Sequence, residues 1–247
     1  MPIGETFIQL IEVESTNNYA MRQVQAHLAG DGYAWFAHSQ SAGKGQRGKV
    51  WLSEPGQNII LSCVIDPKPL PFASAFILSA AVALGCHDFF SSLAGDNTKI
   101  KWPNDIYWKD RKAGGILIEN LVRGSDWKYA IAGMGLNVNQ VVFPAHLLNP
   151  VSLRQITGKQ YDAAELAKEL CTSLDKRCQQ VQDGDTNGIL ADYSGRLYKL
   201  NEQVTFKKGN AFFIATITGV QYNGDLVIDT GEKTSIPFGE VEWVIDS

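Results

Sequence analysis

The sequence of 247 residues is poor in cysteine and carries no excess of positive charge. Its four cysteines form no Cys-x-x-Cys pair. Cys171 and Cys178 lie on one predicted helix, where their Cα atoms would be about 10 Å apart at a rise of about 1.5 Å per residue. That separation is too large for a disulfide. We therefore expect reduced thiols and a cytoplasmic protein.

We expect neither a targeting segment nor a membrane-spanning segment. Residues 1–5, Met-Pro-Ile-Gly-Glu, lack the charged and apolar regions of a signal peptide. The most apolar stretch, residues 72–85, is shorter than the roughly 20 residues that a membrane span requires. We predict that it is a buried helix and that the protein has no membrane partner.

The overall composition is that of a globular protein, with 45% hydrophobic and 19% charged residues. The length suffices for one large domain, or for one with a small appendage. A net charge of −4 argues against general nucleic-acid binding, so we expect no DNA partner.

The most distinctive stretch is residues 39–51, Ser-Gln-Ser-Ala-Gly-Lys-Gly-Gln-Arg-Gly-Lys-Val-Trp, which we call the glycine loop. Glycine lets the backbone approach a ligand closely. Backbone N–H groups together with Lys44, Arg47 and Lys49 would form a site for a phosphate or a carboxylate. Trp51 would add an aromatic wall for a nucleotide base. The alternative interpretation is a mobile surface loop with solvated charges.

Two known motifs match the glycine loop literally but fail on context. Gly43-x-Gly45-x-x-Gly48 matches the dinucleotide-binding fingerprint, and with Val50 it matches the protein-kinase glycine loop. The first requires a helix that begins within the glycines, whereas residues 50–56 are typical of a turn. The second requires His-Arg-Asp and Asp-Phe-Gly signatures, which the sequence does not contain.

Hydrophobic periodicity predicts a mixture of strands and helices up to about residue 198. Strands are expected at residues 7–13, 33–38, 58–65, 115–121 and 127–132, the third of them buried on both faces. Helices are expected at residues 72–90, 151–156 and 188–198, and another is expected to begin after the capping residue Asp162. A further helix is expected near the start of the chain, where Ser15 or Thr16 is the cap and the apolar stripe consists of Tyr19, Ala20, Val24 and Leu28. Turns are expected at residues 103–105, at a hairpin tip formed by Asp110 and Arg111, and at the glycine-rich residues 133–139.

The character of the chain changes after Leu200. Short strands at residues 204–206, 212–217, 226–228 and 234–236 alternate with Lys-Gly-Asn, Asn-Gly-Asp and Gly-Glu-Lys turns. We predict a small all-β barrel, too small to be very stable alone. The predicted domains are therefore residues 1–199 and 200–247.

Three stretches together resemble the catalytic domain of biotin–protein ligases. They are the glycine loop, Lys101-Trp-Pro-Asn-Asp105 followed by Arg111-Lys112-x-Gly-Gly-Ile-Leu, and Gly133-x-Gly-x-Asn137. The resemblance covers nearly the whole chain, including a Glu-Ser-Thr-Asn segment near its start. It implies an α+β fold with a mixed sheet and flanking helices, related to class II synthetases and lipoate ligases, and a small C-terminal all-β barrel.

The resemblance implies an enzyme that works in two steps. The carboxylate of biotin attacks the α-phosphate of ATP and gives biotinyl-5′-AMP and pyrophosphate. A lysine of a biotin carboxyl carrier domain of a carboxylase then attacks the activated carbonyl. Mg²⁺ would bridge the phosphates and needs few protein ligands. Some relatives carry an N-terminal DNA-binding domain, and because Ser15 lies near Met1 we expect none here. A homodimer is the assembly that this interpretation leaves open.

The resemblance also implies a role for each matching residue. The biotin site would contain Ser15, Thr16 and Gln40 around the ureido ring, Gly43, Lys44 and Gly45 near the carboxylate, and Lys112, Gly114 and Gly115 along the slot. The ATP site would contain Gln46, Arg47, Gly48, Lys49, Trp51, Asn104, Asp105 and Asn137, with Asp105 nearest the metal. Catalysis is expected from Lys112, Arg47 and Lys44, and Lys112 would bridge the biotin carboxylate and the α-phosphate. Without the resemblance, a lysine in a hairpin is ordinarily a solvated charge.

One position departs from the family pattern. The family usually has arginine at the position of Gln46. The glutamine side chain supplies no charge to retain the adenylate. Either Arg47 substitutes for that arginine, or the intermediate is held less tightly. The nearest alternative function is a lipoate–protein ligase, whose usual Arg-Arg and Gly-Gly-Gly pattern is missing. A non-enzymatic nucleotide- or RNA-binding module is the second alternative, against which the acidic balance weighs.

Overall fold

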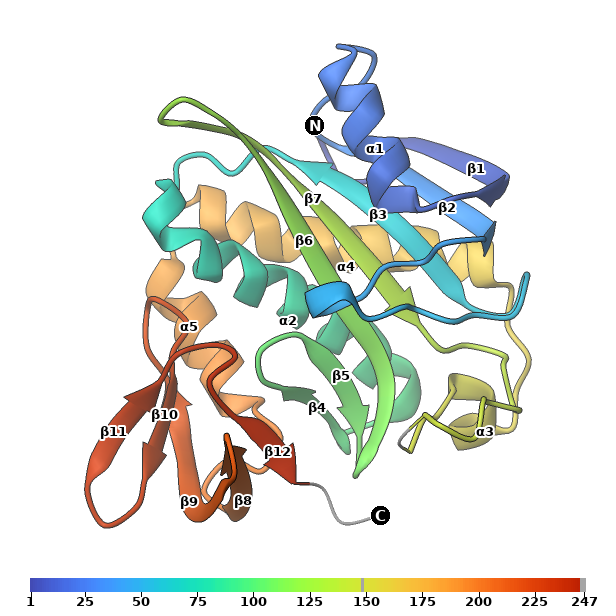
Figure 1. Cartoon of the computed structure of the whole chain (residues 1–247). Coiled ribbons are helices and arrows are strands. Elements are labelled where there is room, and N and C mark those ends of the chain that lie inside the picture. Colours follow the sequence, from blue (N-terminus) through green and yellow to red (C-terminus); the bar gives the residue numbers. More distant parts are fainter. Residues whose placement is uncertain (148, 245–247) are drawn as a thin grey trace.

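The computed structural model describes residues 1–147 and 149–244, and a mixed β-sheet forms its centre (Figure 1). In the described residues this sheet has seven strands in the order β1-β2-β3-β7-β6-β5-β4. The strands are β1 (Thr6–Val13), β2 (Tyr33–Gln40), β3 (Ile59–Ile65), β4 (Thr98–Lys101), β5 (Asp105–Trp108), β6 (Arg111–Arg123) and β7 (Asp126–Leu136). β1 runs parallel to β2, and the other neighbouring pairs are antiparallel. The predicted mixed sheet is confirmed.

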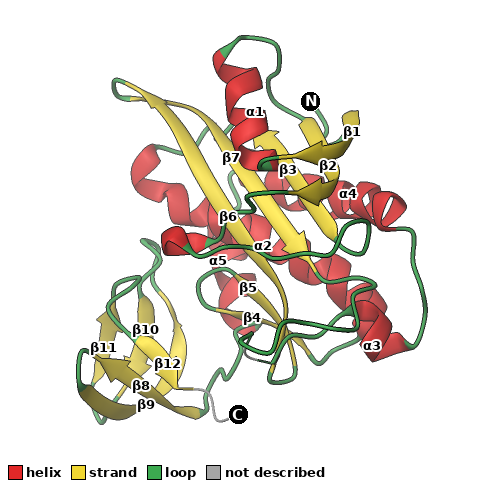
Figure 2. Ribbon diagram, turned by 45° about the vertical axis from the view of Figure 1, so that its right-hand side comes forward, coloured by secondary structure: helices red, strands yellow, loops and turns green. Residues whose placement is uncertain are grey.

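Helices cover both faces of this sheet (Figure 2). They are α1 (Thr16–Gln25), α2 (Ala75–Ala94), α3 (Leu153–Thr157), α4 (Ala163–Gln182) and α5 (Thr186–Gly195). Successive residues of β2 point to opposite faces. Trp35 therefore packs with Ala20 and Val24 of α1, whereas Phe36 packs into the core that contains α2 and α4. The predicted flanking helices are confirmed.

β3 and α2 lie at the centre of the main core. Every residue of β3 is buried, as expected for a strand that is covered on both faces. The segment Phe72–Ala94 is long and apolar enough to cross a membrane by length and composition, yet 67% of the stretch that meets this criterion is buried inside the fold. It is therefore the buried core helix that the sequence predicts.

Among the predicted element ends that differ from the structure, two have a clear cause in the backbone. The first helix ends before Leu28, because His27 takes a left-handed backbone conformation (φ 58°). The β5–β6 hairpin turns at Lys109 and Asp110, and not at Asp110 and Arg111, because Arg111 already begins β6. Lys109 has the left-handed conformation that this tight turn requires (φ 52°).

The glycine-rich residues 133–136 were predicted as part of a turn, but they form the end of β7. Gly133 and Gly135 both pair with residues of β3. Glycine is needed at the second position because a Cβ at Gly135 would meet the Trp51 ring at 2.3 Å. The composition was therefore misleading, since these glycines make room for side chains from other segments and do not turn the chain.

A second, antiparallel sheet forms the C-terminal part of the chain (Figure 1). Within residues 200–244 it has five strands in the order β11-β10-β9-β8-β12. They are β8 (Gln203–Lys208), β9 (Ala211–Val220), β10 (Leu226–Asp229), β11 (Lys233–Ile236) and β12 (Glu242–Val244). β12 was not predicted, because its sequence Glu-Trp-Val is too short to show alternation. Phe206 and Ile217 of this sheet join the main hydrophobic core, and the division of the chain after residue 199 stays a prediction.

Candidate active site

A cavity of about 980 Å³ is lined by residues of β6 and β7, of α1 and of the C-terminal sheet region. Most of the residues predicted for the site line it: Ser15, Thr16, Gln40, Lys44, Gly45, Gln46, Arg47, Lys49, Trp51, Asn104, Asp105, Lys112, Gly115 and Asn137. The structure thus brings together residues from segments that are far apart in the sequence. The glycine loop crosses above β6 and β7, and its Gln46–Gly48 turn (η1) lies between these strands and the C-terminal sheet.

Three predicted residues do not line the cavity, namely Gly43, Gly48 and Gly114. Gly114 is buried, and a Cβ there would meet the side chain of Leu136 and the carbonyl of Gly135. It therefore serves the packing of β6 against β7. A direct role of these glycines in ligand binding stays a prediction.

A network of neutral polar groups lies at the start of α1. Ser15 caps this helix, and its hydroxyl accepts a hydrogen bond from the backbone N–H of Asn18 (3.4 Å). The backbone N–H and the hydroxyl of Thr16 both donate to the Gln40 side-chain oxygen (2.7 and 3.1 Å). The Ser62 hydroxyl lies 2.7 Å from the Thr16 hydroxyl. Ser15, Thr16 and Ser62 are buried, so this end of the cavity offers fixed, uncharged donors and acceptors.

Lys44 already contacts a carboxylate of the protein. Its Nζ lies 3.3 Å from Oε1 of Glu119 on β6. The other oxygen of Glu119 accepts a hydrogen bond from the side chain of Asn17 (2.9 Å), which ties the glycine loop to α1. The sequence interpretation missed Glu119. The signal was its position four residues after Gly115 in a predicted strand, which places both residues on one face.

Amino groups converge at the other end of the cavity. Lys112 Nζ lies 2.8 Å from Oδ1 of Asp105. Lys101 lies opposite Asp105 in the pairing of β4 with β5. Burial lowers the pKa of Lys101 to about 8. Asp105 raises this pKa, and the charges of Lys112 and Lys49 lower it further. Asp105 therefore faces more positive charge than it neutralises. An anionic ligand is stabilised by such an arrangement.

Trp51 lies across the strands between these two ends. Its ring packs against Gly115 of β6 and Gly135 of β7, where a Cβ would meet it at 3.4 and 2.3 Å. Lys112 Nζ lies 5.9 Å from the centre of the ring. The indole N–H is buried and has no acceptor among the described residues.

Two predicted asparagines hold backbone segments in place. The Asn104 amide donates to the carbonyl of Ile116 (2.6 Å). The Asn137 amide donates to the carbonyls of Val151 (3.1 Å) and Lys112 (3.4 Å). Both side chains therefore fix the segments that carry Asp105 and Lys112. The predicted contact of Asn137 with adenine stays a prediction.

The donor set fits a magnesium ion only if the phosphates of a ligand supply most of its ligands. In residues 1–147 and 149–244, no group of three or more His, Cys, Asp or Glu side chains is placed to hold a metal. Mg²⁺ usually keeps several waters and binds one or two carboxylates plus substrate phosphates. Asp105, which lies among the cavity amines, matches that requirement.

The cavity also contains residues that the sequence interpretation did not assign. Among them are Lys101, Tyr107, Phe143, His146, Phe238 and Trp243. Lys101 begins the Lys-Trp-Pro-Asn-Asp motif, so its position was a usable signal. Phe238 and Trp243 come from the C-terminal sheet region, and no local pattern links them to the glycine loop.

Comparison with known proteins gives concordant matches. A family model described as the biotin/lipoate A/B protein ligase family matches residues 10–137. The chain is 30% identical over 233 residues to the bifunctional ligase/repressor BirA of Escherichia coli, covering 92% of this chain and 70% of that protein. It is 28% identical over 240 residues to the biotin–[acetyl-CoA-carboxylase] ligase of Paracoccus denitrificans, covering 94% and 98%. Among solved structures, the biotin protein ligase of Aquifex aeolicus in complex with biotin and ATP has the same fold, with a TM-score of 0.82 at 24% identity over 98% of this chain and 100% of that one.

Proposed function

The chain belongs to the biotin/lipoate A/B protein ligase family, and we propose that it is an enzyme that attaches biotin to a carrier protein at the expense of ATP. The observation that carries this proposal is the division of one cavity into a neutral, hydrogen-bonding end and a cationic end. The neutral end suits the ureido ring of biotin. The cationic end suits the phosphates of ATP.

Biotin is favoured over lipoate by the relatives and by the site. The relatives named above are described as biotin ligases or as a ligase/repressor. The amide of Gln40 and the hydroxyl of Thr16 are paired, buried or half-buried groups that match a polar ring. The dithiolane ring of lipoate has no donors or acceptors to match these groups, so it would gain no hydrogen bond at this end of the cavity.

In the first step, a carboxylate oxygen of biotin forms a bond to the α-phosphorus of ATP, and the bond from that phosphorus to the bridging oxygen breaks. The products are biotinyl-5′-AMP and pyrophosphate. Lys112 stabilises the negative charge as it moves from the carboxylate to the phosphate, and its contact with Asp105 holds its amine at this end. Bound Mg²⁺, held by Asp105 and the phosphates, would neutralise charge on the leaving pyrophosphate.

In the second step, the amine of a carrier lysine attacks the acyl carbon, AMP leaves, and the nitrogen loses a proton to water. The acceptor is a biotin carboxyl carrier domain of a carboxylase. The neutral end of the cavity keeps the biotin ring fixed during both steps, because α1, β2 and β3 supply its hydrogen bonds from packed elements.

Three further properties belong to this proposal. The cysteines are buried, and burial raises the pKa of Cys178 to about 12, which fits unreactive thiols in a cytoplasmic protein. The net charge of −4 supports an enzyme that does not bind DNA. A homodimer is the assembly to test by sedimentation.

The test is to incubate the purified chain with ATP, Mg²⁺ and either biotin or lipoate, and to detect the acyl-adenylate by mass spectrometry. We expect biotinyl-AMP and pyrophosphate with biotin, and at most traces of adenylate with lipoate. Equal product from lipoate would assign the alternative substrate, and no product from either acid would refute a ligase.

A further inference from the structure

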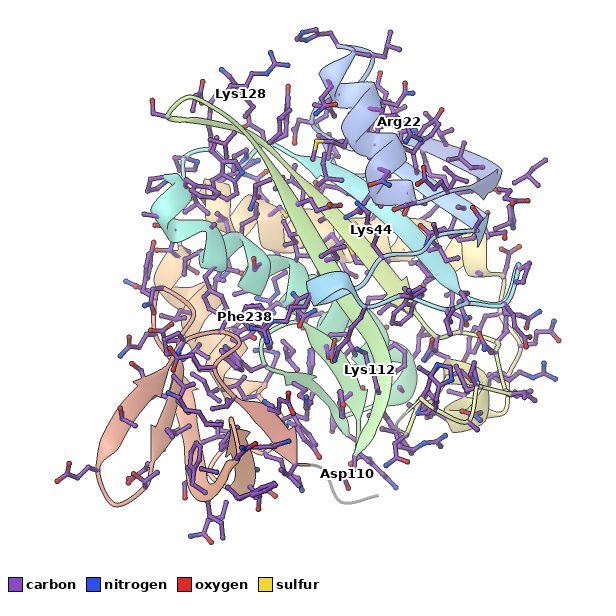
Figure 3. All side chains as sticks on the ribbon, viewed as in Figure 1. Arg22, Lys44, Asp110, Lys112, Lys128 and Phe238 are labelled. Atoms are coloured by element: carbon purple, nitrogen blue, oxygen red, sulfur yellow. The ribbon has the colours of Figure 1, made fainter. Side chains whose placement is uncertain are left out.

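Arg47 of the glycine loop contacts a residue from the far end of the chain. Its guanidinium carbon lies 4.8 Å from the centre of the Phe238 ring, in the segment between β11 and β12. Figure 3 places Phe238 between the C-terminal sheet and the glycine loop. Both residues line the cavity described above. This contact therefore joins the two parts of the chain at the ligand site.

The backbone beside Phe238 is shaped around the guanidinium group. Gly239 has a φ of +92°, and a Cβ there would lie 1.1 Å from a terminal nitrogen of Arg47. Any other residue would both strain this backbone and occupy the place of the guanidinium group. Arg47 itself has a left-handed backbone conformation (φ 56°), which is uncommon for a residue other than glycine.

Phe238 is held by a second aromatic contact. Its ring packs edge-on against Trp102, with centroids 5.8 Å apart and planes at 79°. Trp102 is buried, and its indole N–H donates to the carbonyl of Gly224 in the C-terminal region (2.8 Å). Phe238 is thus fixed between Arg47 and the segment that leads to Asp105, although it is itself 49% exposed.

The charge of Arg47 is not neutralised by the protein. In the part of the chain that the structure describes, Lys44 pairs with Glu119 and Lys112 pairs with Asp105, but no carboxylate forms an ion pair with Arg47. The face of an aromatic ring attracts a cation without cancelling its charge. Arg47 is therefore positioned and still available to an anion.

We propose that Phe238 is a positioning residue for nucleotide binding: together with Gly239, it holds the Arg47 guanidinium at the cavity, where it binds a phosphate of ATP and of the adenylate. This inference rests on the proposed function and deepens it. The C-terminal sheet thereby contributes to retention of the nucleotide and not to recognition of biotin.

The test compares Phe238→Ala with Phe238→Trp and with a matched control, Phe212→Ala. Phe212 on β9 is also an exposed phenylalanine beneath a cation, since Lys207 lies 6.0 Å from its ring, but it does not line the cavity. Phe238→Ala should raise the Kd and KM for ATP by roughly three- to thirtyfold, the scale of a lost cation–π contact, and leave the Kd for biotin unchanged. Phe238→Trp should keep the ATP affinity of the wild type, because it keeps an aromatic ring, and Phe212→Ala should not change the ATP affinity.

A double variant separates positioning from a general effect on the fold. Adding Phe238→Ala to Arg47→Ala should weaken ATP binding no further than Arg47→Ala alone. Equal effects of Phe238→Ala and Phe212→Ala, additive effects with Arg47→Ala, or an equal loss of biotin binding would overturn the inference. ATP titrations without biotin test the role of Phe238 independently of the proposed function. A lack of biotin-dependent pyrophosphate exchange in the wild type would refute the proposed function alone.

Discussion

The two ends of the cavity differ in how the protein holds them. At the neutral end, Thr16 and Ser62 are buried, and they belong to a helix and a strand of the central sheet. At the cationic end, Arg47 and Lys49 are exposed and lie on a loop. Uncharged groups can be buried in advance when they are hydrogen-bonded to one another, whereas unpaired charges cannot. Under the proposed function, the ring of biotin would therefore meet a preformed surface, and the phosphates would meet Arg47 and Lys49, which stay in water until the ligand arrives.

The largest expected effect lies at the cationic end. Lys112→Ala should slow adenylate formation by roughly two to three orders of magnitude, the usual loss when one charge-stabilising group is removed from a transition state. Biotin-dependent pyrophosphate exchange measures this rate. Lys128→Ala, at the far end of the β6–β7 hairpin in Figure 3, is the matched control and should have no effect. A loss below about fivefold would make Lys112 an ordinary solvated charge.

The substitution Thr16→Val tests whether the neutral end binds biotin. This change keeps the shape of the side chain but removes the hydroxyl between Gln40 and Ser62. The ring of biotin would then lose one hydrogen-bonding partner in the complex, which costs about 1–3 kcal/mol, so biotin binding should weaken by roughly tenfold to a hundredfold. Calorimetric titration should show an unchanged affinity for ATP. Thr172→Val on the exposed face of α4 is the control. A parallel loss of ATP affinity would contradict the separation of the two ends.

Adding a positive charge to the cationic end should strengthen the binding of biotinyl-AMP. Gln46→Arg should slow the escape of biotinyl-AMP by a few-fold to about thirtyfold, because a charge-assisted hydrogen bond contributes about 1.5–3 kcal/mol and a neutral one about 1. Tryptophan fluorescence from Trp51 would follow the dissociation. Gln25→Arg at the exposed end of α1 adds the same charge outside the cavity. If neither Gln46→Arg nor Arg47→Ala changes the rate, the charge argument for this loop is wrong.

The smallest expected effect concerns pH. Burial lowers the pKa of Lys101 from 10.5 to about 8. ATP affinity should therefore fall about threefold to tenfold as pH rises past 8 and this amine loses its charge. Between pH 8 and 10.5 the unfolded chain binds more protons at Lys101 than the folded chain, so its contribution to the free energy of unfolding rises with pH.

Two variants isolate this titration. Lys101→Arg stays charged over the whole range, so its ATP affinity should not fall near pH 8. Lys101→Met should bind ATP more weakly at pH 7 and show no further loss attributable to this group. A wild-type profile that is identical to the Lys101→Arg profile would contradict the role given to Lys101.

What the sequence could predict follows the same division. The residue types of the glycine loop already indicated an anion site, whereas Asp105 and Lys112 were assigned to the site only through the family resemblance of their motifs. The central strand β3 and the core helix α2 were recognisable because their apolar runs are continuous. Both predictions rest on neighbours in the sequence.

Contacts between distant segments could not be predicted in this way. Phe238 meets Arg47, and Trp51 meets Gly135, across long stretches of chain with no local pattern to link them. Gly135 was placed in a turn because its neighbours are glycine-rich, whereas the Trp51 ring requires the missing Cβ in a strand. The residues of one cavity wall are thus defined by the packing of the glycine loop and the C-terminal sheet, and not by spacing.

The most direct test of the two-ended cavity is the thermal shift of the protein with biotin, with ATP and Mg²⁺, and with all three. If both ends belong to one site, the adenylate fills them together, and stabilisation grows with the logarithm of affinity. The shift with all three ligands should therefore exceed the sum of the separate shifts. A merely additive shift, or no shift with biotin, would contradict it.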